Sequence, residues 1–351
     1  MIRRTETLKK ILKEKSIPAI FITNLADVSY LSGFTGTTAY MIVSHDRCVF
    51  FTDGRYTVQA RDEVYPHIEK ITVKSYKDLF EKEVTKYRRI MLQGECPLSI
   101  ASAVKSQGTD IIVDSNSIIK TMRMIKDRDE IALIKAQYRL AAEAFKESLS
   151  SFKMGLSEIE WAAALEYNIK KKGAKGVSFE TIVASGYRGA MPHGCASQKI
   201  INKDEPVIID FGSQKGYASD YTRMIYGGND KNVTTVINIV REAMLKAIEA
   251  VKPGVTSAYL DDVARQHISS FGYGEYFNHS LGHGVGIDVH ELPVINSQSN
   301  NIIEENMIFT IEPGIYLPDK FGVRLEETVL VTSYGAEVIS SFLEDYVYLP
   351  K

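Results

Sequence analysis

The chain has 351 residues, 44% hydrophobic and 25% charged, with a net charge of −2. This length allows about two domains, and the balanced charge gives no electrostatic reason to expect nucleic acid or an anionic membrane as a partner. No apolar run is long enough to span a bilayer or to form a signal peptide behind Met1. The three cysteines are odd in number and widely spaced, so we expect no disulfide framework and a cytoplasmic location.

The first third of the chain alternates apolar runs with helical spacing. Helical patterns at 5–15 and 54–63 alternate with strand-like runs at 18–22, 39–43, 48–52, 69–73, 89–92 and 110–113. This alternation predicts an α/β domain with a mixed sheet over residues 1–122. Asp53, Arg55 and His67 are isolated there, so structural roles are expected for them.

Residues 123–351 follow a different pattern, in which helices precede pairs of strands that carry carboxylates. A long helix is expected to follow the segment 124–130 and to run through about Phe152. Ser157-Glu158-Ile159-Glu160 has the spacing of a capping box, and further helices are expected at about 158–172, 233–251 and 258–271. The helices and strand pairs occur twice in the same order. We therefore predict a second, α+β domain built from two pseudo-repeated halves.

The segment 277–291 holds three of the seven histidines, His279, His283 and His290. Glycines at 282, 284 and 286 flank the middle one and allow close approach of other groups, and the apolar residues between them predict a segment that runs through the interior. Imidazoles in such surroundings need partners. Two arrangements satisfy that need. One is a buried strand whose histidines are hydrogen-bonded, and the other is a metal or catalytic site.

Two pairs of carboxylates interrupt apolar, strand-like stretches. Asp210 and Asp220 are joined by a link with a turn at Gln214-Lys215-Gly216, and Glu312 and Glu326 by a link with a turn at Pro318-Asp319-Lys320. A single acid of this kind is explained by a strand-end charge or a salt bridge. Four such acids with a histidine suit a site that holds two divalent ions.

The motifs that carry these acids resemble those of the proline-specific metallopeptidases, prolidase and aminopeptidase P, in the pita-bread superfamily of methionine aminopeptidase. The resemblance rests on Asp210-Phe211-Gly212, Ser219-Asp220-Tyr221-Thr222-Arg223, His279-Ser280-Leu281-Gly282-His283-Gly284, Glu312-Pro313-Gly314 and Arg324-Leu325-Glu326. Residues 1–122, with Thr52-Asp53-Gly54-Arg55-Tyr56, resemble the creatinase-type N-terminal domain of the same family. The implied fold is a creatinase-type α/β domain followed by a pita-bread catalytic domain at 123–351.

The resemblance implies a role for each matching position. It makes Asp210, Asp220, His283, Glu312 and Glu326 the ligands of two divalent ions, Mn²⁺ or Co²⁺, which activate water for attack on the bond before proline. Glu312 would also carry the proton from the attacking water to the leaving nitrogen. His193, His279 and His290 would contact the substrate, and Arg324 would orient the acidic ligands. The implied substrates are small proline-containing peptides, and the implied assembly is a homodimer.

The chain departs from the family pattern in two places. The link between Asp210 and Asp220 is one residue shorter than usual, and we expect the deletion to fall in the turn. Many prolidases carry an arginine that grips the free carboxylate of a dipeptide where this chain has Gln298, which cannot form the same paired contact. We expect an Xaa-Pro dipeptidase, with aminopeptidase P as the alternative and a non-catalytic binding protein as a more distant one. A non-catalytic binding protein, or a metal-free hydrolase like creatinase, would be marked by the loss of metal ligands. All five ligand positions implied by the resemblance are kept in this chain.

Overall fold

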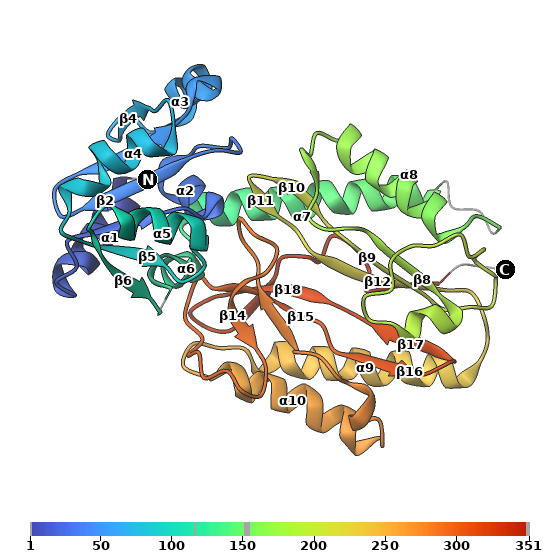
Figure 1. Cartoon of the computed structure of the whole chain (residues 1–351). Coiled ribbons are helices and arrows are strands. Elements are labelled where there is room, and N and C mark those ends of the chain that lie inside the picture. The colour runs from blue at the N-terminus through green and yellow to red at the C-terminus, as the bar shows by residue number, and fades with distance from the viewer. Residues whose placement is uncertain (1, 116, 151–154, 349–351) are drawn as a thin grey trace. The chain divides into compact units, whose positions relative to one another are not determined.

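The computed structural model describes residues 2–115, 117–150 and 155–348, and the chain divides into two compact units, Met1–Arg123 and Met124–Lys351 (Figure 1). Within the described residues, no helix is both long enough and apolar enough to cross a membrane. The mixed sheet expected for the first unit and the paired helix–strand halves expected for the second are both confirmed. Each unit is described by itself below.

The first unit is a six-stranded sheet in the order β4-β3-β2-β1-β5-β6 with parallel and antiparallel neighbours. Its strands are β1 (Ala19–Ile22), β2 (Tyr40–Ser44), β3 (Cys48–Thr52), β4 (Glu69–Thr72), β5 (Arg89–Gln93) and β6 (Asp110–Asp114). Its helices are α1 (Ile2–Glu14), α2 (Leu25–Ser32), α3 (Thr57–Glu63), α4 (Tyr76–Lys82), α5 (Leu98–Ser106) and α6 (Ile118–Met124), with short 3₁₀ turns η1 (Gly54–Tyr56) and η2 (Val84–Lys86). Asp53 caps η1 and binds Arg55, as expected for structural residues.

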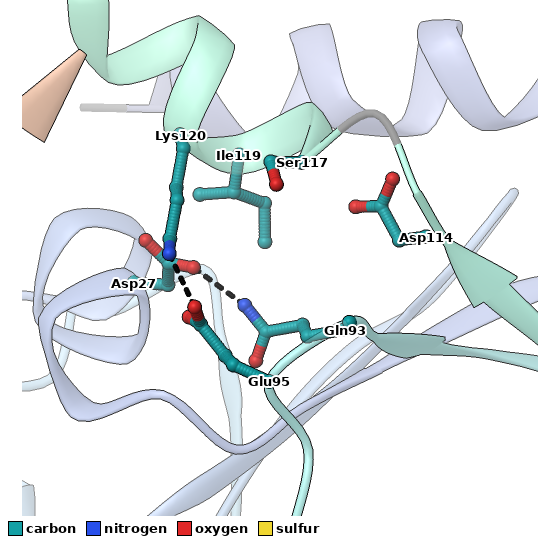
Figure 2. A pocket seen from close by; sticks show the side chains of 8 residues that line it. Asp27, Gln93, Glu95, Asp114, Ser117, Ile119 and Lys120 are labelled. Atoms are coloured by element: carbon teal, nitrogen blue, oxygen red, sulfur yellow. Dashed lines mark hydrogen bonds and ion pairs between the residues drawn. The ribbon is translucent and has the colours of Figure 1, made fainter. Parts of the chain in front are cut away.

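A small pocket in the first unit holds a buried polar network (Figure 2). The buried carboxylate of Asp27 accepts hydrogen bonds from Arg123 at 2.7 Å and from Gln93 at 2.5 Å, and Lys120 pairs with Glu95 at the rim. The contacts join α2 to β5 and α6. The Asp27 carboxylate is thus both paired and hydrogen-bonded, as a buried charge requires.

The second unit places its strands between two pairs of helices, labelled α7 and α8 and α9 and α10 in Figure 1. The pairs are α7 (Arg128–Ser150) with α8 (Glu158–Lys171), and α9 (Lys231–Ala250) with α10 (Ser257–Ser270). Ser157 and Glu160 form the expected capping box of α8. On α9, residues at helical spacing such as Val236, Val240 and Met244 are buried against the strands. Each helix pair thus covers its own apolar core beside the strands that carry the carboxylates.

Within residues 124–150 and 155–348, the strands form four sheets, in the orders β11-β10-β7, β20-β12-β9-β8, β14-β13-β15-β18-β19 and β16-β17. The strands of the first half, with β20, are β7 (Gly176–Val177), β8 (Ile182–Ser185), β9 (Val207–Phe211), β10 (Ser213–Lys215), β11 (Tyr217–Ala218), β12 (Tyr221–Tyr226) and β20 (Tyr346–Tyr348). Those of the second half are β13 (Gly282–Gly284), β14 (Glu291–Ile295), β15 (Ile308–Ile311), β16 (Gly314–Leu317), β17 (Phe321–Arg324), β18 (Glu327–Val331) and β19 (Ala336–Val338). The 3₁₀ turns η3 (Gly186–Ala190) and η4 (Gly274–Tyr276) complete the unit.

The segment 277–291 differs from the expectation that it runs through the interior. Its strand residues are the three of β13 and Glu291, which begins β14. A register shift follows His283, and the chain then bends through 286–290. Leu281 and Val285 are buried, but His290 is exposed. The apolar residues between the histidines were therefore a misleading sign of a continuous buried strand.

Candidate metal centre

The first carboxylate pair meets because the chain doubles back tightly after β9. Thr222 of β12 lies opposite Asp210 in the antiparallel register. A side chain at Gly212 would place its Cβ 1.9 Å from the Ser219 carbonyl, so only glycine allows this close approach. The short hairpin β10–β11 turns at Gly216, whose φ is +79°, and Asp220 then enters beside Asp210.

The second pair lies where two neighbouring strands change sheets. β15 pairs with β18, and β16 pairs with β17, so the switch falls at Glu312-Pro313 on one side and at Leu325-Glu326 on the other. The carboxylates of Asp210, Asp220 and Glu326 each offer an oxygen within 4.8 Å of the others. Acids from both halves of the unit therefore converge on one centre.

His283 connects Glu312 to this centre. Its Nε2 lies 3.3 Å from Glu312 Oε1 and 3.5 Å from Asp220 Oδ2. Its Nδ1 lies 3.1 Å from the Gly284 carbonyl, which can only accept, so Nδ1 carries the hydrogen and Nε2 is the nitrogen directed at the acids. A neutral His283 would present the lone pair of Nε2 to a metal, whereas a protonated His283 donates from Nε2 to Glu312.

Three of the four carboxylates at the centre have raised pKa values. Burial, together with the neighbouring carboxylates, raises the pKa values of Asp220 and Glu326 well above their usual range. Burial also raises the pKa of Asp210, although Arg324 opposes the rise. For Glu312 burial is outweighed, because the hydrogen bond and charge of His283 lower its pKa to about 2.

Two carboxylate oxygens of the centre are buried without a hydrogen-bond partner among the described residues. They are Oδ1 of Asp210 and Oε1 of Glu326. A buried polar atom without a partner is costly, and a cation removes that cost. Four carboxylates and one imidazole, with these unpartnered oxygens, fit divalent ions that prefer oxygen and nitrogen donors.

Arg324 links the carboxylates to the loop that carries His193. Its Nη2 donates to Asp210 Oδ2 at 2.6 Å, its Nε donates to the Thr222 hydroxyl at 3.0 Å, and its Nη1 donates to the Pro192 carbonyl at 3.0 Å. These bonds fix one oxygen of Asp210 and leave the other unpartnered. They also hold the backbone next to His193.

His279 is engaged on both ring nitrogens. Nδ1 lies 2.8 Å from the Ser280 carbonyl and must donate to it, and burial lowers the pKa of the ring, so Nε2 accepts from the Tyr316 hydroxyl at 2.9 Å. The same hydroxyl oxygen accepts from Arg324 Nη1 at 2.9 Å. The ring of His279 therefore ends a chain that begins at Asp210.

His193 and His290 are exposed, and within the described part of the second unit neither ring makes a hydrogen bond. The His290 ring lies 4.2 Å from that of His283, measured between centroids. Gln298 is exposed, with its backbone N–H donating to Asn296 at 3.0 Å, and it makes no hydrogen bond to the acids or histidines of the centre among the described residues. The structure thus gathers the acids and four histidines and leaves Gln298 outside this network.

Three residues of the centre received no role from the sequence. Tyr316 joins Arg324 to His279, Thr310 donates to Glu312 at 2.9 Å and accepts from the His283 backbone at 3.1 Å, and Arg223 donates to the Glu326 carbonyl. Tyr316 and Thr310 lie within four residues of Glu312. A polar residue near a candidate ligand in an apolar strand is the signal that could have found them.

Comparisons with known proteins agree with this geometry. The family model described as metallopeptidase family M24 matches residues 132–333, and the creatinase/prolidase N-terminal domain matches residues 4–125. An Xaa-Pro dipeptidase of Pyrococcus furiosus is 37% identical over 96% of this chain and 97% of its own length. A prolidase structure from Pyrococcus horikoshii aligns with a TM-score of 0.92 at 34% identity, covering 96% of this chain and 98% of that one.

Another solved structure, with a different name, has a higher sequence identity and a lower TM-score. The X-Pro aminopeptidase of Thermotoga maritima is 40% identical, with a TM-score of 0.88, over 95% of this chain and 98% of its own. The matches cover both units and run through the strands that carry the four acids. The chain is a member of metallopeptidase family M24 with a creatinase/prolidase-type N-terminal domain.

Proposed function

We propose that the chain is a metal-dependent peptidase that hydrolyses the bond before proline, with Xaa-Pro dipeptides as its main substrates. The observation that carries the proposal is the convergence of Asp210, Asp220 and Glu326, with buried oxygens on two of them that lack partners. Asp210, Asp220, His283, Glu312 and Glu326 would hold two divalent ions. Ions bound there would polarise the scissile carbonyl and activate a water molecule as the nucleophile.

The chain's own residues would move and steady the proton and the substrate. The Glu312 carboxylate lies beside His283 and Thr310, and it would accept the proton of the attacking water and later give it to the proline nitrogen. His193 and His290, whose ring nitrogens make no hydrogen bond within the described residues, would contact the substrate carbonyl. His279, bound to Ser280 and Tyr316, would instead fix the position of Tyr316 and Arg324.

Aminopeptidase P activity on longer peptides is the second candidate. Gln298 favours it, because a neutral amide cannot grip a dipeptide carboxylate as arginine does. The 40% identity to the X-Pro aminopeptidase of Thermotoga maritima favours it as well. The near-full-length similarity to Xaa-Pro dipeptidases favours the first candidate.

A comparison of Xaa-Pro with Xaa-Pro-Xaa peptides, with added Mn²⁺ or Co²⁺, tests the proposal. We expect cleavage of both, with a higher kcat/KM for the dipeptide, and a further shift towards dipeptides in Gln298→Arg. An Asp220→Asn variant should lose both activities, since the cation loses a charged ligand. Full activity after metal removal, or in Asp220→Asn, would contradict the metal mechanism, and an unchanged substrate ratio in Gln298→Arg would contradict the role of that loop.

We further propose Mn²⁺ or Co²⁺ as the working ion, a homodimer as the assembly and the cytoplasm as the location. The oxygen-rich donor set with one imidazole supports the choice of ion. Elemental analysis of protein purified without chelator, and mass measurement in solution, test the first two. Cell fractionation with an antibody against the chain tests the third.

A further inference from the structure

Residues 285–291, the last part of the segment 277–291, form a loop whose backbone sets the position of His290. The His290 ring is exposed and makes no hydrogen bond within the described residues. Its contact with the His283 ring therefore depends on the backbone that carries it. That backbone is held from two separate parts of the second unit.

The β10–β11 hairpin, which leads to Asp220, holds the first part of the loop. Gln214 donates from Nε2 to the Ile287 carbonyl at 2.8 Å, and the Ala218 backbone N–H donates to the Gly286 carbonyl at 2.8 Å. Gln214 lies in the shortened link of this chain. One hairpin thus positions a candidate metal ligand and the loop of His290 together.

A buried ion pair holds the other end of the loop. The Lys126 ammonium lies 3.5 Å from Glu291 Oε2, and the two side chains are only 1% and 5% exposed. Glu291 Oε1 accepts from the Asp288 backbone at 3.0 Å, and a Cβ at Gly286 would collide with this carboxylate at 2.5 Å. Lys126 is itself fixed, because its backbone N–H donates to the Asn306 carbonyl at 3.0 Å.

We propose that Lys126 and Gln214 are positioning residues that set the place of His290 beside His283 and the substrate. The expected effect on the rate rests on the proposed peptidase function. The expected effect on the position of the loop rests on the contacts above. Gln214 makes no hydrogen bond to the carboxylates of the centre among the described residues, and Lys126 forms its ion pair with Glu291 of the loop. Because both contacts are made to the loop that carries His290, we expect their effect on the rate to pass through His290, and the metal content of each variant tests whether Asp220 keeps its place.

A double-mutant cycle with His290→Ala tests this path. In the wild-type background, Lys126→Met and Gln214→Leu should each lower kcat roughly tenfold, since a small displacement of a catalytic group has an effect of this order. In the His290→Ala background the same changes should lower kcat less than about twofold. Equal losses in both backgrounds would show a general structural role and overturn the proposal.

Hydrogen–deuterium exchange gives a readout that does not depend on activity. Backbone amides of 285–291 should exchange faster in Lys126→Met and Gln214→Leu, while those of 312–316 and the metal content stay unchanged. Lys126→Met/Glu291→Gln, which leaves no buried charge alone, should show the same local effect if Lys126→Met folds poorly. Lys135→Met, which removes a surface pair with Glu337, is the matched control and should change neither rate nor exchange.

The two measurements separate failure of the inference from failure of the function. Unchanged exchange at 285–291 in both variants would refute the proposal that Lys126 and Gln214 hold this loop in place. A wild-type protein that cleaves no Xaa-Pro peptide would remove the proposed function and the catalytic half of the inference, and the exchange result would still decide the structural half.

Discussion

Replacing Arg223 by methionine should weaken both the fold of the second unit and its hold on metal. Arg223 is fully buried and donates to the Glu326 carbonyl at 2.5 Å, to the Glu327 carboxylate at 3.2 Å and to the carbonyls of Ser340 and Leu343 at 3.3 and 3.4 Å. Removing one partner of a buried ion pair costs about 3–5 kcal/mol. Burial raises the pKa of Glu327, so it can relieve the loss by taking up a proton, which favours the lower end, about 3 kcal/mol.

That loss corresponds to a fall in Tm of about 6–12 °C for a unit of this size. The Glu326 carbonyl also loses its anchor, so metal affinity should fall about 10–100-fold, as for other groups that support metal ligands. Calorimetry of the metal-free protein and isothermal titration with Mn²⁺ measure the two effects. Arg241→Met is the control, because the Arg241 side chain is 49% exposed in its pair with Asp345 and should matter by less than about 1 kcal/mol. An Arg223→Met protein with the Tm and metal affinity of the control would refute the reasoning.

Three further changes test other parts of the molecule. Tyr316→Phe removes the hydroxyl that donates to His279, so kcat should fall roughly tenfold while the metal content stays unchanged. Steady-state kinetics and elemental analysis measure the two quantities, and loss of the ions would contradict the account. Burial lowers the pKa of His267 below its usual 6.5, so the unfolded chain binds its proton first and stability should fall as pH drops below 6.5. In His267→Gln the fall between about pH 7.5 and about pH 5.5, measured by urea unfolding, should be smaller, and an equal fall would show that other groups cause it. Arg123→Met should destabilise the first unit by about 3 kcal/mol, because it leaves the buried Asp27 without its cation, and an unchanged unfolding curve by circular dichroism would contradict this.

The sequence predicted the regular elements well, because their signals are local. The capping box at Ser157 and Glu160 and the helical spacing of α9 depend on neighbours within one or two turns. A continuous apolar run likewise placed β9, whose Asp210 interrupts a buried strand. The apolar strand around an acid was therefore enough to mark it as a candidate ligand.

The sequence could not predict features that arise where strands change partners. Glu312 and Glu326 lie at such switches, and nothing local reveals that β15 leaves one sheet as β16 enters another. The same holds for Tyr316, whose hydroxyl meets His279 across 37 positions of sequence. The segment 277–291 was expected to be interior throughout, but the chain bends after β13 and exposes His290. The contacts that hold this loop come from Lys126 and Gln214, which are distant in sequence.

The number of divalent ions that the chain binds tests the central claim most directly. Metal-free protein titrated with Mn²⁺ and followed by calorimetry and by Xaa-Pro hydrolysis should bind two ions per chain, with activity returning as they bind. Glu326→Gln should bind fewer ions at the same concentration, with its activity reduced in parallel. Hydrolysis at full rate without bound ions, or two ions bound equally well by Glu326→Gln, would contradict the account.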